Sequence, residues 1–182
     1  MITLTINRYN FNELSPDAQK RAIEDIRKVE NNNFPDFLLE EAMEEKASEL
    51  LYGNYEISNK DLKVYYSLSY SQGDGVAFAG EIFASDKPNL TLPVNCHRVQ
   101  ITHSGHYYHE YSFNVELFDA EYEEIDGGEI VLEELRDICR QLARYGYKWI
   151  EDYLSDDSLK ERLIDAGEVF TESGKWDDQE GN

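Results

Sequence analysis

The chain has 182 residues, and 38 Asp and Glu against 17 Lys and Arg give it a formal net charge of −21. Such a charge disfavours nucleic acid and anionic membranes as direct partners, because the field of the protein repels both, and it favours a basic protein partner. Although acidic chains are often disordered, 13 Tyr, 8 Phe and 2 Trp provide enough apolar surface for a folded core.

The first third of the chain predicts a short strand followed by two helices. Residues 2–6 alternate between apolar and polar side chains, which is typical of a strand. Ser15-Pro16-Asp17 then favours a helix start, with Ser15 as N-cap and Pro16 in the first turn. We expect this helix to end at residues 31–33 and a second helix to run from Phe34 to about Gly53. The residues expected to be buried are Ala18, Ala22, Ile26 and Val29 in the first helix, and Leu39, Met43, Ala47 and Leu50 in the second.

Residues 61–84 predict a β-hairpin. Val64, Tyr66, Leu68 and Tyr70 alternate with residues that point to the opposite face, the period of a half-buried strand. A three-residue loop at 73–75 keeps the apolar faces of the two arms together, whereas a two-residue turn mixes them. The three-residue loop places Tyr70 opposite Phe78 and Tyr66 opposite Ile82, with Gly75 in a left-handed conformation.

The rest of the chain predicts further antiparallel strands and then two helices. Apolar residues fall on even positions in 90–96 and on odd positions in 99–103, so we expect a break near His97 and Arg98. Another three-residue loop, from Ser104, leads into a strand at 107–117, and an acidic run follows at 119–129. Apolar residues recur every three or four positions over 130–154. Residues 158–161 fit a capping box for a last helix, and residues 168–171 favour a short strand.

This order of elements predicts an α+β fold, in which an antiparallel sheet of about four to six strands has helices packed on one face. We expect one domain over residues 1–172 and a loose acidic tail over 173–182. Cys96 and Cys139 are too few for a disulfide framework, which favours a reducing compartment. No segment resembles a signal peptide or reaches the ~20 apolar residues that span a bilayer, so we expect a cytoplasmic location.

Two acidic segments are candidate partner-binding surfaces. The second helix carries carboxylates one turn apart, which repel each other in an isolated helix. These acids and the run at 119–129 imitate the charge of a phosphate backbone, although a solvated face of an acidic protein gives the same pattern. Asp74 lies between two glycines, where a hairpin tip favours Asp, and no nucleophile–base pair is visible around it. The candidate residues are Glu40, Glu41, Glu44, Glu45, Asp74, Asp119, Glu121, Glu123, Glu124 and Asp126.

Two further clusters each have two interpretations. Arg136, Arg140, Arg144 and Lys148 form a basic stripe on the long helix, for which local pairing with Glu133, Asp137, Glu151 and Asp152 is the favoured interpretation. The alternative is a homodimer, in which the stripe of one copy meets acids of another. The second cluster consists of residue types that bind zinc, namely Cys96, His97, His103, His106 and His109. No second ligand pair has fixed spacing and tyrosines surround the histidines, so aromatic packing is favoured and no metal or cofactor is expected.

Three motifs carry a resemblance that spans most of the chain: FNELSPDAQ at 11–19, SYSQGDG at 69–75 and FTESGK at 170–175. Together they resemble a family of small acidic proteins encoded by phages and mobile elements, some of which carry an antitoxin-like label. At least one resembling protein is an anti-CRISPR that acts on a type II effector nuclease. The resemblance implies a phage origin and an inhibitory role in the cytoplasm of the host cell, and it assigns no catalytic residue.

Charge and resemblance together predict a binding protein rather than an enzyme. The leading hypothesis is an anti-CRISPR inhibitor that binds a basic, nucleic-acid-handling effector nuclease through acidic patches and blocks its activity. The first alternative is an antitoxin that neutralises a partner toxin. The second is a metal-dependent enzyme that uses the histidine cluster. Neither direct binding of nucleic acid nor association with a membrane is expected.

Overall fold

The computed structural model describes residues 7–52, 55–56, 61–85 and 92–176. By its contacts the chain divides into two compact units, one formed by residues 1–36 and 149–182 and the other by residues 37–148. Each unit is described by itself below. The expected strand at 2–6 lies outside the described residues, and the single domain over 1–172 stays a prediction.

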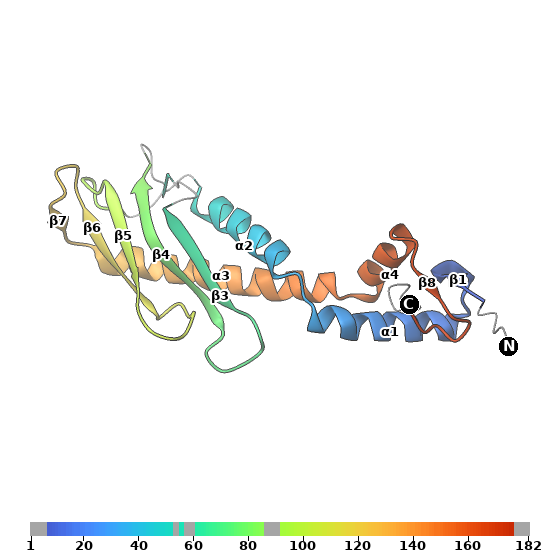
Figure 1. Cartoon of the computed structure of the whole chain (residues 1–182). Helices are drawn as coiled ribbons and strands as arrows, with labels where there is room; N and C mark the ends of the chain where they lie inside the picture. Colours follow the sequence, from blue (N-terminus) through green and yellow to red (C-terminus); the bar gives the residue numbers. More distant parts are fainter. Residues whose placement is uncertain (1–6, 53–54, 57–60, 86–91, 177–182) are drawn as a thin grey trace, which may run out of the picture. The chain divides into compact units, whose positions relative to one another are not determined.

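The first unit brings the two ends of the chain together. Its elements are β1 (Tyr9–Asn10), η1 (Phe11–Glu13), α1 (Pro16–Asn32), α4 (Asp156–Asp165) and β8 (Val169–Phe170). β1 and β8 pair antiparallel, with Tyr9 opposite Phe170 (Figure 1). The predicted start of α1 is confirmed, because the Ser15 hydroxyl accepts a hydrogen bond from the Ala18 N–H at 3.4 Å. The core consists of Phe11, Leu14, Ala18, Ala22, Ile23, Ile26, Leu159, Leu163 and Phe170.

The end of the chain differs from expectation in two places. The N-cap of α4 is Ser155 rather than Ser158: the Ser155 hydroxyl accepts from the Ser158 N–H at 3.3 Å, and Asp156 and Asp157 follow at the positive end of the helix. The tail expected to be loose from residue 173 makes contacts as far as Trp176. The Trp176 indole donates to a Glu168 carboxylate at 2.7 Å, and Gly174 is buried. Residues 177–182 lie outside the described part of the chain.

The second unit is built on a six-stranded antiparallel sheet. The strands are β2 (Tyr55–Glu56), β3 (Leu62–Ser67), β4 (Gly75–Ala84), β5 (Arg98–His103), β6 (Phe113–Phe118) and β7 (Glu124–Ile125). β4 pairs with β5 along one edge and with β3 and β2 in succession along the other. α2 (Asp36–Leu51) and α3 (Gly128–Tyr153) pack on one face of the sheet, and Figure 1 shows α3 running behind the strands. The predicted α+β class with helices on one face is therefore confirmed.

The core of this unit lies between the helix-covered face of the sheet and the two helices. α2 buries Leu39, Met43, Ala47 and Leu51, so its last buried position is Leu51 instead of Leu50. The helices approach closely at Gly146, where an added Cβ would lie 2.4 Å from Leu68 Cδ1 and 3.0 Å from the sulfur of Met43. The larger side chains that the sheet buries fully are Val76, Phe78, Ile82, Val99, Ile101, Phe113 and Leu117.

Both predicted hairpin registers are wrong by six positions. In the first hairpin Tyr66 lies opposite Val76 rather than Ile82, so the loop contains residues 68–74. In the second, His103 lies opposite Phe113 rather than residue 107, so the loop contains residues 104–112. An even shift keeps the residues that remain in the strands on their predicted face. Residues 68–74 and 104–112 lie in the loops instead, where Tyr70, Tyr107 and Tyr111 are exposed and not on a buried face as predicted. Gly75 is a strand residue, and the positive φ angles belong to Tyr70 (58°) and Gly73 (96°).

The strand predicted over residues 90–96 is absent from residues 92–96, the part of it that the structure describes. Residues 92–97 contain no strand, and Val94 is fully exposed, at 107 %. The predicted turn at 87–89 and residues 90–91 lie outside the described part of the chain. The expected break before Arg98 is confirmed, because β5 begins there and buries Val99 and Ile101 at the predicted odd positions.

Gly80 provides a test of the β3–β4 pairing. Its φ is +122°, and an added Cβ would lie 1.7 Å from the carbonyl oxygen of Asp61, so Gly80→Ala has to displace the start of β3. We expect a loss of roughly 3 kcal/mol or more in the free energy of unfolding, measured by urea denaturation. Gly105→Ala is the matched control, because φ is +116° there but no atom lies within 4 Å. It should cost only about 1 kcal/mol; equal losses in the two variants would contradict this pairing.

Candidate partner-binding surfaces

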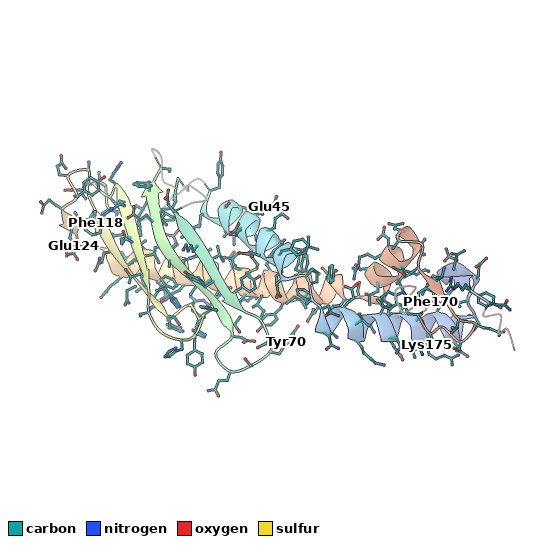
Figure 2. All side chains as sticks on the ribbon, viewed as in Figure 1. Glu45, Tyr70, Phe118, Glu124, Phe170 and Lys175 are labelled. Carbon is teal, nitrogen blue, oxygen red and sulfur yellow. The ribbon has the colours of Figure 1, made fainter. Side chains whose placement is uncertain are left out.

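The four candidate acids of α2 lie on its exposed side. Since Leu39, Met43 and Ala47 face the core, the helical period turns Glu40, Glu41, Glu44 and Glu45 outward, and all four are exposed. Figure 2 shows Glu45 on this side of the helix. Among the described residues, none of these four carboxylates has a cationic partner. Lys46 instead pairs with Glu49 at 2.7 Å and lies over the Tyr145 ring.

The acidic run after β6 forms a tight turn and then a short strand. Asp119 has a structural role, because its carboxylate accepts from the N–H groups of Glu121 at 3.0 Å and Glu123 at 2.9 Å. The carboxylates of Glu121, Glu123, Glu124 and Asp126 are exposed. This segment also borders a groove. Glu45 and Glu124 lie at separate places in Figure 2, so the structure does not bring the two sets of acids together.

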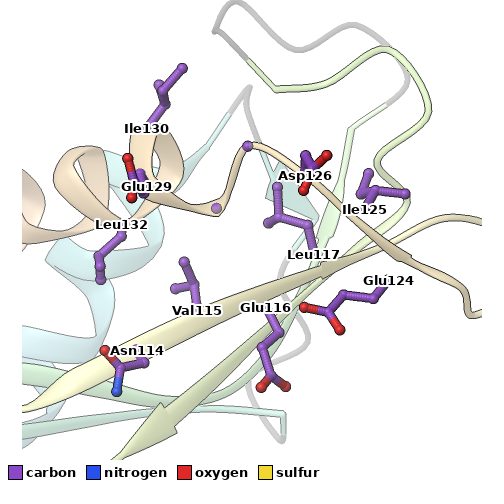
Figure 3. A pocket seen from close by; sticks show the side chains of 12 residues that line it. Asn114, Val115, Glu116, Leu117, Glu124, Ile125, Asp126, Glu129, Ile130 and Leu132 are labelled. Atoms are coloured by element: carbon purple, nitrogen blue, oxygen red, sulfur yellow. The ribbon is translucent and has the colours of Figure 1, made fainter.

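A groove of about 460 Å³ runs between β6 and the start of α3 (Figure 3). Its lining includes the acidic residues Glu116, Glu124, Asp126 and Glu129 and the apolar residues Ile125, Ile130 and Leu132. The side chains of Glu116 and Glu124 extend on the side of β6 opposite to Val115 and Leu117 (Figure 3). No Lys, Arg or His lines it, and the sequence has none between His109 and Arg136. We call this feature the acidic groove. Glu116 was absent from the candidate set, although the alternation along β6 places it on the exposed face.

Asp74 is the central hydrogen-bond acceptor of the loop at 68–74. Its carboxylate accepts from the N–H groups of Ser69 (2.6 Å) and Ser71 (2.8 Å) and from the Tyr147 hydroxyl (2.9 Å). The hydroxyls of Ser67, Ser69 and Ser71 also donate to it. Burial by itself would raise the pKa of Asp74, but the hydrogen bonds, led by those from Ser71, hold it well below its ordinary value. Burial and the bond to Asp74 raise the pKa of Tyr147 to about 12.

Two of the four basic residues of the α3 stripe, Arg136 and Arg140, form ion pairs within their own unit. Arg140 pairs with Glu133 at 2.9 Å and with Asp137, and Arg136 pairs with Glu133 at 3.4 Å. Hydrogen bonds from Arg140 and Arg136 lower the pKa of Glu133. The favoured interpretation, local ion pairing, is confirmed for these two arginines, and the sequence pattern missed Glu110, which lies 3.9 Å from Arg140. The homodimer stays a prediction.

The cysteine and histidines do not converge. His103 packs against Tyr65 and Tyr108, His109 stacks on Tyr111, and His97 contacts the edge of Phe83. The Cys96 thiol lies 3.8 Å from the Arg98 carbonyl. Over the described residues there is no group of three or more His, Cys, Asp or Glu side chains that could hold a metal ion.

Comparison of the chain with protein-family models, curated proteins and solved structures gives no match. The family resemblance therefore stays a prediction based on three short motifs. In the described part of the chain, no helix combines the length and the apolar character needed to cross a bilayer.

The hydrogen bonds of Asp74 predict a large effect of a small substitution. Asp74→Asn removes one acceptor oxygen and turns an NH₂ group toward the donors that Asp74 satisfies, so we expect a loss of about 2 kcal/mol in the free energy of unfolding. Asp126→Asn, at an exposed groove position, should change it by less than about 0.5 kcal/mol. Both are measured by urea denaturation at neutral pH. Equal stability of the two variants would show that Asp74 does not organise the loop.

The lowered pKa of Asp74 also predicts a pH dependence. Because this pKa lies below the ordinary 3.8, the folded state binds the proton less readily than the unfolded state. The resulting stabilisation is therefore fully present above about pH 4 and is lost as the pH falls toward the folded-state pKa. We expect the stability difference between wild type and Asp74→Asn to narrow from pH 5 to about pH 2.5. A difference that stays constant over this range would contradict the assignment.

Proposed function

We propose that the protein is an inhibitor of the anti-CRISPR kind, which binds a basic, nucleic-acid-handling effector nuclease through acidic surfaces and blocks its activity. One observation carries the proposal: the exposed carboxylates of α2 and of the acidic groove have no cationic partner among the described residues. The acids beside the basic stripe of α3, by contrast, are paired within the chain. A carboxylate that no cation of the chain neutralises is available to pair with a cation of a partner.

Electrostatics favours a basic partner for these two surfaces. Four glutamates within six residues of α2 give a row of negative charge in which neighbours lie one helical turn apart. Four more acidic residues line the groove or lie on the strands that border it, and its apolar side chains include Ile130, which is 55 % exposed. A partner that binds nucleic acid has a basic channel, which such rows of carboxylates can occupy in place of phosphates. A channel filled in this way is closed to DNA.

The proposal predicts that charge at these positions, rather than net charge alone, determines affinity. We would measure binding to a purified, guide-loaded type II effector nuclease at low and moderate salt, together with DNA cleavage. The α2 variant combines E40Q, E41Q, E44Q and E45Q; the groove variant combines E116Q, E124Q, D126N and E129Q. A matched control removes four exposed charges from the other unit: E24Q, E161Q, D165N and E172Q.

We expect at least one of the first two variants to bind roughly tenfold more weakly at low salt, mainly through a slower association rate, and to show a flatter dependence on salt. The control variant should lose much less affinity, because it removes the same number of charges from outside these two surfaces. If wild type neither binds the effector nor slows cleavage, the proposal is wrong. If all three variants lose affinity equally, binding depends on net charge and not on these surfaces.

A further inference from the structure

The two long loops of the sheet display a group of exposed tyrosines that the acidic surfaces do not account for. The loops at 68–74 and 104–112 join β3 to β4 and β5 to β6 at the same end of the sheet (Figure 1). The exposed tyrosines are Tyr70 (68 %), Tyr107 (64 %), Tyr108 (38 %) and Tyr111 (63 %). The loops are in contact, since an added Cβ on Gly73 would lie 2.9 Å from the Tyr107 ring. Single exposed aromatic residues are common, whereas four on two adjoining loops form a patch.

The rings of this tyrosine patch are held in place by the residues beneath them. Tyr70 packs on Tyr147 at a centroid distance of 4.6 Å, and the Tyr147 hydroxyl donates to Asp74 at 2.9 Å. Tyr108 stacks on Tyr65 at 5.2 Å. Tyr111 stacks on His109 at 5.3 Å and lies under the Arg136 guanidinium at 4.8 Å. Rings that are already ordered lose little entropy when a partner binds them, which is the property of a preorganised binding surface.

The charge of the tyrosine patch differs from that of the rest of the molecule. Its loops contain only two acids, Asp74 and Glu110. Asp74 is satisfied by its serine and tyrosine donors, while Glu110 contacts His109 at 3.2 Å and Arg140 at 3.9 Å. Attraction for a cation at this end therefore has to come from the faces of the tyrosine rings, whose quadrupole is negative.

Arginine already packs on aromatic rings within the chain, in one case on Tyr111 of the patch itself. The guanidinium groups that lie over rings are those of Arg98 (Phe118, 4.7 Å), Arg136 (Tyr111, 4.8 Å) and Arg162 (Tyr153, 3.9 Å). The net charge of −21 draws basic surfaces toward the protein, and the exposed ring faces then favour the planar, weakly hydrated guanidinium over an ammonium.

We infer that the tyrosine patch is a second contact surface, which binds an arginine-bearing face of a protein partner and supplies specificity that the acidic surfaces lack. The inference deepens the proposed function and takes from it only that the partner is a basic protein. Its test therefore uses simple probes instead of the effector nuclease. These are a short peptide with two arginines, the same peptide with two lysines, and a thymidine oligonucleotide, each titrated into ¹⁵N-labelled protein and followed by NMR.

We expect the arginine peptide to shift amide resonances of residues 68–74 and 104–112, with several-fold tighter binding there than the lysine peptide. The variant Y70F/Y107F keeps both rings and should bind like wild type. Y70L/Y107L keeps apolar bulk without the ring face and should bind about tenfold more weakly. Tyr52→Leu, at an exposed tyrosine outside the patch, should have no effect. If Y70L/Y107L melts below wild type because Tyr107 supports Gly73, Tyr70→Leu alone gives the comparison.

Three results would overturn the inference. The first is equal binding of the arginine and lysine peptides with shifts confined to α2 and the acidic groove. The second is unchanged binding of the arginine peptide by Y70L/Y107L. The third is tighter binding of the oligonucleotide than of the arginine peptide at the same tyrosines, which would indicate base stacking. Failure to inhibit the effector nuclease would contradict the proposed function but leave a positive peptide result intact.

Discussion

One carboxylate determines much of the geometry at the loop end of the sheet. Asp74 accepts hydrogen bonds from two backbone N–H groups and three serine hydroxyls of its own hairpin, and from Tyr147 on α3. These bonds tie the loop at 68–74 to the end of β3 and to α3, next to the contact of Tyr70 with Tyr147. Tyr107 packs on Gly73, so the position of the second loop depends on it as well.

Asp74 also shows why the hairpin register could not be predicted from the sequence, although the fold class could. Alternation of apolar residues specifies which face of a strand is buried, and that face is unchanged by any even shift in register. Selecting among even registers requires knowing what stabilises the loop. For the first hairpin that includes the Tyr147 hydroxyl, 73 residues away from Asp74 in the chain. The caps of the helices were easier to predict when they depended on adjacent residues, as at Ser15.

The candidate surfaces likewise divide into features that follow from local sequence patterns and features that depend on contacts between distant parts of the chain. Helical period alone places the four glutamates of α2 on the exposed side, because their positions follow from those of Leu39 and Met43. For the acidic groove, the sequence predicted the acidic residues at 119–129 but not the groove itself. The groove requires the start of α3 to lie beside β6, and no local pattern indicates that arrangement. Glu110 was likewise missed as a partner of Arg140, 30 residues further along the chain. Residues brought together by a non-local fold are those that sequence patterns do not specify.

The pairing of β1 with β8 has a consequence for synthesis of the protein. Residues 37–148 form a contiguous unit, whereas the other unit joins residues 1–36 to residues 149–182. At about 5–20 residues per second, α1 leaves the ribosome on the order of ten seconds before α4. During that interval the apolar side of α1, with Ala22 and Ile26, has no Leu159 or Leu163 to cover it. A chain that stops before α4 therefore keeps this apolar surface exposed to solvent.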